Sequence, residues 1–310
     1  MRRIALLGPQ RLQPIISRTV DRLAGKGPLA VVTAGWQERE SEVDELADHV
    51  RRPVTNLRLH GRAEEIFLSH PELFGALRER QNRLKVLQQL HRLRLDFGLE
   101  PARRLLRRPA AGPFLAEEQE AAIEAVRALD DHHAARIGEI HRQFEEDWKD
   151  AFDEALQDHR RELGEVLRAS AALAIAGGHV AVLLNRLRLF DIPALLGELP
   201  VVAWSAGAMA LAERIVLFHD RPPQGAGNAE ILNLGLGLAP GVLPLPHAES
   251  RLRLDDPVRV SLFARRFAPA ACVTLDRSSS LLREERGWVA GESTRRLLPN
   301  GGVEEFEVLG

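Results

Sequence analysis

The chain has 310 residues, of which 45% are hydrophobic, enough for one large domain or two ordinary ones with a substantial core. A formal net charge of −2 excludes the overall basic excess that draws a protein onto nucleic acid or anionic membranes. The single cysteine, Cys272, excludes an internal disulfide, and the apolar runs are too short for a signal peptide or a membrane-spanning helix. We therefore expect a cytoplasmic protein that binds neither nucleic acid nor membrane.

The N-terminal segment alternates between strand and helix patterns. The run RRIALLG at 2–8 predicts a first strand, and helical spacing follows at 11–27. The almost wholly apolar run PLAVVTAGW at 28–36 predicts a second strand, buried on both faces, and the acid-rich segment 37–50 predicts an exposed helix. This alternation favours an α/β domain with a parallel sheet.

From residue 63 to residue 168 the pattern is helical throughout. Leucines recur at three- and four-residue steps over 72–99, and a second long helical pattern covers 115–169. Two prolines and a glycine in RRPAAGPF, at 107–114, predict that the two tracts fold back on one another. The first arm is rich in arginine and the second in acids, which is typical of an antiparallel hairpin with solvated faces rather than of an RNA-binding arm.

The resulting domain prediction is an α/β domain made of residues 1–62 and 169–310, with residues 63–168 as a helical hairpin insertion. The hairpin is interpreted either as a lid over the sheet edge where α/β proteins keep their sites, or as an arm for homodimerisation. Its histidines lack the spacing of metal-binding helices, so we expect them on the surface and expect no metal site. They are His132, His133, His141 and His159.

After residue 170 the α/β pattern returns. The run AALAIAGG at 171–178 predicts a buried strand that ends in two glycines, 180–199 predicts an amphipathic helix, and PVVAW at 200–204 predicts another buried strand. A further helix is predicted at 259–268. Short strands are predicted at 271–276, 279–284, 287–291 and 303–309.

Ser205 follows the strand at 200–204 and precedes a predicted helix at 207–216. A serine at the apex of a strand–turn–helix unit, with small neighbours, is the geometry of a nucleophile elbow, and the helix N-terminus behind it offers N–H groups to an oxyanion. The other interpretation is that the small residues only permit tight packing. A nucleophile needs a base and an orienting acid. His247, held on a loop by two prolines, and Asp220, at the exit of the predicted helix, are the candidates.

The ordered set of GG at 177–178, SAGA beginning at Ser205, Asp220 and the dipeptide Pro246-His247 resembles the aspartyl dipeptidase (peptidase E) and cyanophycinase family of serine peptidases. The resemblance runs from about residue 171 to the C-terminus, and more weakly over 2–54. It implies a class I glutamine amidotransferase-like α/β fold: a mostly parallel sheet with helices on both faces. It also implies Ser205 as nucleophile, His247 as general base, Asp220 as the orienting acid, an oxyanion hole made by the N–H groups of Gly178 and Ala206, and no cofactor.

The resemblance further implies small acidic substrates, because members of this family cleave dipeptides with an N-terminal aspartate or β-aspartyl-arginine units. The chain departs from the family pattern at His179, Ala248 and Arg277. Arginines can bind a substrate carboxylate with two hydrogen bonds, although each arginine here can equally be solvated. The candidate substrate-binding residues are His179, Arg251, Arg253 and Arg277.

The function predicted from the sequence is a serine peptidase that cleaves small peptides or isopeptides with an acidic residue at the scissile bond. The alternative is a catalytically idle relative whose hairpin binds a protein partner or a ligand. An esterase of the α/β-hydrolase type has the same order of Ser, Asp and His, but Asp220 lies too close to Ser205 for that fold. Glutamine amidotransferase activity is disfavoured because the apex is a serine and Cys272 lies elsewhere.

Overall fold

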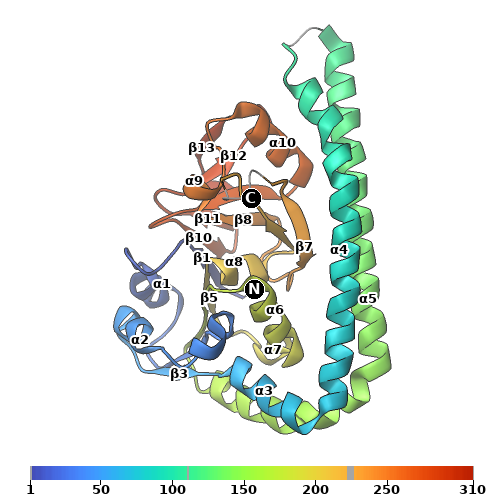
Figure 1. Cartoon of the computed structure of the whole chain (residues 1–310). Helices are drawn as coiled ribbons and strands as arrows, with labels where there is room; N and C mark the ends of the chain where they lie inside the picture. The colour runs from blue at the N-terminus through green and yellow to red at the C-terminus, as the bar shows by residue number, and fades with distance from the viewer. Residues whose placement is uncertain (1, 110–111, 222–226, 310) are drawn as a thin grey trace.

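The structure, a computed structural model, describes residues 2–109, 112–221 and 227–309. Within these residues an eight-stranded sheet forms the centre of the molecule (Figure 1). Five neighbouring strands, β1, β5, β4, β2 and β3, run parallel to one another. On the other side of β1, each of the strands β10, β11 and β14 runs antiparallel to the strand before it. The α/β class with a mostly parallel sheet is thus confirmed. In spatial order the strands are β14 (Val308–Leu309), β11 (Gly287–Ala290), β10 (Ser280–Glu284), β1 (Ile4–Leu7), β5 (Val201–Trp204), β4 (Ala172–Ile175), β2 (Leu29–Val32) and β3 (Val54–Asn56).

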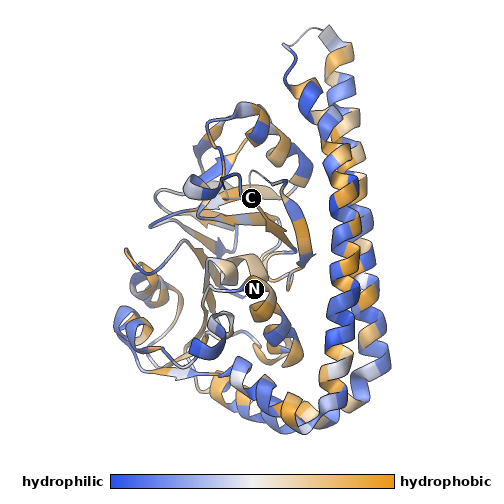
Figure 2. Cartoon of the chain, in the orientation of Figure 1, coloured by the Kyte–Doolittle hydropathy of each residue, from blue (hydrophilic) through white to orange (hydrophobic). Residues whose placement is uncertain are grey.

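Helices cover both faces of this sheet, which is why β1, β2, β4 and β5 are buried at every residue. One face packs against α1 (Ile16–Leu23) and α2 (Asp44–Val50). The other packs against α3 (Leu59–Ser69), α6 (Val180–Leu189) and α7 (Ile192–Leu195). Figure 2 shows the matching hydropathy, with apolar strands between helices of mixed character.

The chain also forms a second, smaller layer apart from the main sheet. It consists of a four-stranded sheet, a two-stranded ribbon and the helices between their strands. The four-stranded sheet has the order β13 (Val303–Glu305), β12 (Arg295–Leu297), β9 (Ala271–Leu275) and β8 (Val242–Pro246), and the ribbon joins β6 (Arg214–Leu217) to β7 (Glu230–Leu234). The helices of this layer are α9 (Ala248–Arg251) and α10 (Pro257–Phe267), and a 3₁₀ turn, η1 (Ala34–Arg39), follows β2.

Two long helices, α4 (Pro71–Leu106) and α5 (Gly112–Arg168), lie antiparallel and side by side along one flank of the molecule and extend past it (Figure 1). Part of the predicted turn, residues 110–111, lies outside the described residues. The hairpin packs on the rest of the chain through α10 and β7, and also through α3 and α7. Most ion pairs of α5 join residues of that helix, as in Arg142 with Glu139 and Glu146, so the acidic face is solvated as predicted.

Several predicted elements differ from the structure. The helix after Ser205 ends at Leu211, and residues 214–217 form β6 instead, because the β-branched pair Ile215 and Val216 pairs with β7. The helix predicted at 180–199 breaks after Leu189, where Asp191 takes a positive φ of 49°. Strand β3 was not predicted, and the strand predicted at 303–309 is two strands, β13 and β14.

The prediction that the hairpin histidines lie on the surface is wrong for two of them. His133 and His141 are buried, with 2% and 6% of their surface exposed. Both sit on the face of α5 that packs against β7, where His133 Nε2 reaches the backbone oxygen of Ile231 and His141 Nε2 reaches Asn233 Oδ1. In each ring Nε2 is satisfied by a tertiary contact, which helical spacing alone does not reveal.

None of the helices in the described part of the chain combines the length and the apolar character needed to cross a membrane.

Candidate active site

Ser205 stands between β5 and α8 (Ala206–Leu211) with a strained backbone, φ 51° and ψ −120°. Such a conformation costs free energy in a non-glycine residue, and strained residues of this kind cluster at functional sites. The turn is also tight. A Cβ at Gly207 would lie 2.4 Å from the Ile175 oxygen, and one at Gly177 would lie 2.8 Å from the Ser205 Cβ. The small neighbours of Ser205 are therefore required by the geometry of the turn.

Gly178 and Ala206, the two predicted oxyanion donors, have N–H groups for which the described chain shows no backbone acceptor. Gly178 has a φ of 114°, and a Cβ there would lie 2.4 Å from the Gly35 oxygen, so only glycine fits. Its N–H makes no backbone hydrogen bond within the described chain. Ala206 begins α8, so its N–H has no acceptor within that helix.

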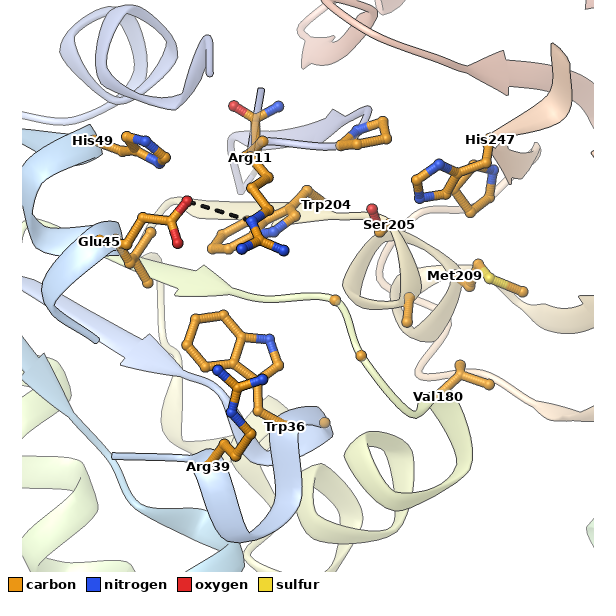
Figure 3. A pocket seen from close by; sticks show the side chains of 18 of the residues that line it. Arg11, Trp36, Arg39, Glu45, His49, Val180, Trp204, Ser205, Met209 and His247 are labelled. Atoms are coloured by element: carbon orange, nitrogen blue, oxygen red, sulfur yellow. Dashed lines mark ion pairs between the residues drawn. The ribbon is translucent and has the colours of Figure 1, made fainter. Parts of the chain in front are cut away.

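His247 directly follows β8 and lines the same cavity as Ser205. Its backbone takes the left-handed conformation, φ 59°, and its N–H donates to the Leu275 oxygen at 3.2 Å. Figure 3 shows its imidazole on the side of the cavity where the Ser205 hydroxyl lies. Within the described residues no hydrogen bond joins the two side chains.

Burial lowers the pKa of His247, and the neighbouring Arg251 guanidinium lowers it further. Both effects disfavour the imidazolium. At neutral pH the imidazole is therefore uncharged, which is the form that can accept a proton from a serine.

The cavity has a volume of about 890 Å³, and Ser205 in its wall is half-buried. Trp36 and Trp204 form part of its wall, together with Arg11 and Arg39 (Figure 3). Arg251 also lines it. Its lining contains no residue of α3, α4 or α5 among those described, so in this structure the hairpin does not cover the cavity and does not act as a lid.

Of the four candidate substrate-binding residues, only Arg251 lines this cavity. His179 caps α6 instead, because its Nδ1 accepts a hydrogen bond from the Val182 N–H at 3.3 Å. Arg253 pairs with Asp256 at 3.4 Å, and Arg277 is exposed after β9. For these three residues the expected contact with a substrate in the cavity is not supported.

Asp220 is buried but is joined to other partners than His247. Its carboxylate accepts two hydrogen bonds from the Arg259 guanidinium, the shorter at 2.6 Å, and one from the Arg253 N–H at 2.9 Å. Within the described residues no hydrogen bond joins Asp220 to His247, so its role as the acid that orients His247 stays a prediction that these contacts do not support. The sequence order suggested that role, but the chain reaches Asp220 through strand β6 rather than directly from the elbow helix.

Asp276 is a buried carboxylate that the sequence interpretation missed. Strands β8 and β9 are parallel with Pro246 opposite Leu275, so their next residues, His247 and Asp276, follow neighbouring strand ends. Asp276 Oδ1 accepts from the Glu249 N–H at 3.1 Å, whereas Oδ2 has no hydrogen-bond partner in the described chain and lies 3.7 Å from Arg295. Burial is the main cause that raises the pKa of Asp276.

The N-terminal segment supplies cavity residues that the sequence interpretation also missed. Arg39 donates to Glu42, and Arg11 lies 3.8 Å from Glu45. Trp36 was assigned to the end of a strand but belongs to η1. Its position after a buried parallel strand could have indicated a cavity residue, since the carboxyl ends of such strands face ligand sites. Among the described residues no group of three or more His, Cys, Asp or Glu side chains could hold a metal ion.

Comparisons with known proteins yield structural similarity only. No family model and no curated protein sequence matches the chain. The crystal structure of a peptidase from an acI-B1 Actinobacterium is similar with a TM-score of 0.49 and 13% identity, covering 99% of this chain and 97% of that one. A provisionally assigned peptidase E protein from Listeria monocytogenes EGD-e is similar with a TM-score of 0.45 and 9% identity, covering 94% and 98%.

Proposed function

We propose that this protein is a serine hydrolase that cleaves amide bonds in small peptides or isopeptides. One observation carries the proposal: Ser205 is held at a strained strand-to-helix apex, in a cavity shared with His247 and beside two available N–H groups. A serine that only filled space at this turn would have no need of a positive φ. The resemblance of the GG, SAGA and PH motifs to the peptidase E and cyanophycinase family supports the same function.

The proposed mechanism is acyl transfer. His247 takes the proton of the Ser205 hydroxyl as Oγ attacks the substrate carbonyl, and the N–H groups of Gly178 and Ala206 hold the oxyanion of the tetrahedral intermediate. Collapse of that intermediate breaks the C–N bond, and the amine leaves with the proton from the imidazolium. Water, deprotonated by His247, then hydrolyses the acyl-enzyme. We assign stabilisation of the imidazolium to Asp276, because Asp220 is engaged with Arg259.

For the substrate we propose a short peptide with an acidic residue, Asp or β-Asp, at the scissile bond. The cavity volume suits a ligand of a few residues. Its three arginines, Arg11, Arg39 and Arg251, support recognition of a carboxylate, since an arginine can bind one with two charge-assisted hydrogen bonds. To bind the substrate, the Arg39 side chain would have to break its hydrogen bond with Glu42.

A second candidate is a catalytically idle protein that binds a partner or ligand. Two observations favour it: the Ser205 hydroxyl and the His247 imidazole are not hydrogen-bonded, and Asp220 is tied to Arg259. This candidate predicts no covalent chemistry at Ser205.

A fluorophosphonate probe separates the two candidates. We expect the wild type and a Ser170→Ala control to be labelled and Ser205→Ala to remain unlabelled, as read by intact-mass spectrometry. Absence of labelling in the wild type would favour the idle protein. A screen of dipeptides that begin with Asp, β-Asp, Glu or a neutral residue then tests the substrate, and equal turnover of all four would remove the proposed role of the arginines.

A further inference from the structure

A second cavity, of about 310 Å³, lies between the hairpin and the α/β body, where α3 and α4 meet α6. It shares no lining residue with the cavity of Ser205. Four cationic side chains line it: Arg78, Arg80 and Lys85 from α4, and Arg186 from α6. Its single acidic lining residue, Glu64, is paired with Arg186 at 2.9 Å.

Arg80 is the unusual member of this group. It is 9% exposed, its Nε is buried without a hydrogen-bond partner, and it makes no ion pair with any described residue. Its guanidinium stacks on the Phe144 ring, 4.2 Å from the ring centroid. A buried arginine is normally paired with a carboxylate, because desolvating an unpaired charge is costly.

The positive charge of Arg80 persists despite its burial. Burial, and then the neighbouring Arg188, lower the pKa of Arg80 to about 10, against a smaller opposite effect of Glu145. The guanidinium is therefore protonated at neutral pH. Arg78 and Lys85 likewise make no ion pair, so three cations at this cavity have no salt-bridge partner among the described residues.

The rest of the lining is apolar or neutral. Phe67, Phe74, Leu77 and Leu189 contribute hydrophobic surface, and Asn185 and Gln81 bridge the two helices through a 3.3 Å hydrogen bond. Such a mixture of a few charged groups and apolar surface is typical of a small-molecule site.

We propose that this cavity binds a small organic phosphate, with the phosphate dianion at Arg80 and Lys85 and an apolar group against the phenylalanines. A dianion matches several unpaired cations better than a monoanion does, and arginine is suited to phosphate by its fork of donors. The site is separate from the proposed hydrolase site, and its test does not depend on catalysis.

Phenyl phosphate is a suitable probe, because it is largely a dianion at pH 7.5 and carries an apolar ring. Isothermal titration calorimetry in buffer without other multivalent anions should show one site per chain. Inorganic phosphate should bind more weakly, and phenol should not bind measurably. Arg80→Met keeps the contact with Phe144 but removes the charge, and it should weaken phenyl phosphate binding by about tenfold or more.

Lys85→Gln, an exposed position on the same cavity, should also weaken binding and provides a test if Arg80→Met fails to fold. The matched control is Arg94→Gln, an exposed arginine of α4 that does not line the cavity, and its affinity should equal that of the wild type. Unchanged binding in Arg80→Met and Lys85→Gln, equal weakening in Arg94→Gln, or absence of binding to the wild type would each overturn the proposal.

Discussion

At the scale of single residues, the two buried aspartates considered as partners of His247 have different surroundings. Asp220 forms a pair with Arg259 in which both side chains are largely buried, at 2% and 9% exposure. Asp276 has one oxygen without a hydrogen bond and lies at the strand end next to that of His247. We infer that Asp220 stabilises the fold and Asp276 serves the site.

Substitution distinguishes these roles. Asp220→Asn leaves the Arg259 charge buried without its partner, so the free energy of unfolding in urea should fall by about 3–5 kcal/mol. Asp276→Asn should retain most of the stability and lose kcat against the best dipeptide. Asp255→Asn, at an exposed position, is the control for both measurements. A stable Asp220→Asn protein with lost kcat would restore Asp220 as the orienting acid.

The pH profile of the proposed hydrolase depends on Arg251. His247 acts as a base only when neutral, and its pKa is lowered by burial and by Arg251, so kcat/KM should reach half its plateau below pH 6.5. Arg251→Gln removes a neighbouring positive charge, which raises the pKa of His247 and moves this acidic limb to higher pH. The profile of Arg286→Gln, whose exposed side chain is outside the cavity, should not move. A limb that stays in place in Arg251→Gln would show that another group titrates.

At the scale of elements, the seam between the hairpin and β7 holds buried neutral histidines. The Nδ1 atoms of His133 and His141 are buried without hydrogen-bond partners among the described residues, so a proton added there would find no acceptor. Burial is the first cause that lowers the pKa of each to about 4, with help from the stacked His91 for His133 and from Arg188 for His141. This seam therefore favours the uncharged form of both rings.

Stability should consequently fall on acidification. Below an unfolded-state pKa of about 6.5 the unfolded chain binds protons that the folded chain does not, so the loss develops between pH 6.5 and pH 4, at up to about 1.4 kcal/mol per pH unit for each histidine. At pH 5 this amounts to about 2 kcal/mol each, measurable by urea unfolding at pH 7 and pH 5. His141→Gln should reduce the difference between the two pH values, and the exposed His132→Gln should not. Equal differences in all three proteins would contradict this assignment.

At the scale of the whole molecule, the hairpin and the α/β body share hydrophobic cores. Phe152, Leu156 and Leu163 of α5 pack in the same cluster as the strand residues Ile4 and Val201. Leu84, Ile137 and Ile140 join a second cluster with residues of β6 and β7. Whether residues 63–168 form a separate domain stays a prediction, but these shared cores favour one cooperative unit.

One cooperative unit implies one unfolding transition. Far-UV circular dichroism follows mainly the long helices, and tryptophan fluorescence in a Trp148→Phe variant follows only Trp36, Trp204 and Trp288 of the body. The two signals should give the same midpoint and slope in urea. Two separated transitions would show that the hairpin unfolds independently.

Local sequence patterns were sufficient to predict most of the secondary structure and the position of Ser205 at a strand-to-helix turn. The buried strands β1, β2, β4 and β5 were visible as apolar runs, and the hairpin was visible from its leucine spacing and its prolines. The elbow could be predicted because its requirement for small residues is itself local. His247 was a candidate base because of its two neighbouring prolines, and the resemblance to a family supported its pairing with Ser205.

Other parts could not be predicted, because they depend on contacts between distant segments. Arg259 of α10 forms hydrogen bonds with Asp220, and Trp36 and Arg39 of η1 line the cavity. His133 and His141 contact residues of β7, which is distant from them in the sequence. No spacing within one segment encodes such pairs.

By itself the sequence determined the α/β class, the long helices and the serine at a tight turn, since each follows from the periodicity or the size of neighbouring residues. Only the tertiary structure decided which carboxylate follows the strand end next to that of His247, which arginines border the cavity and that the hairpin leaves it uncovered. These outcomes depend on which strand ends and helix faces meet in space. The electrostatic partners and the burial of a side chain are determined by these spatial contacts, not by its neighbours in the sequence.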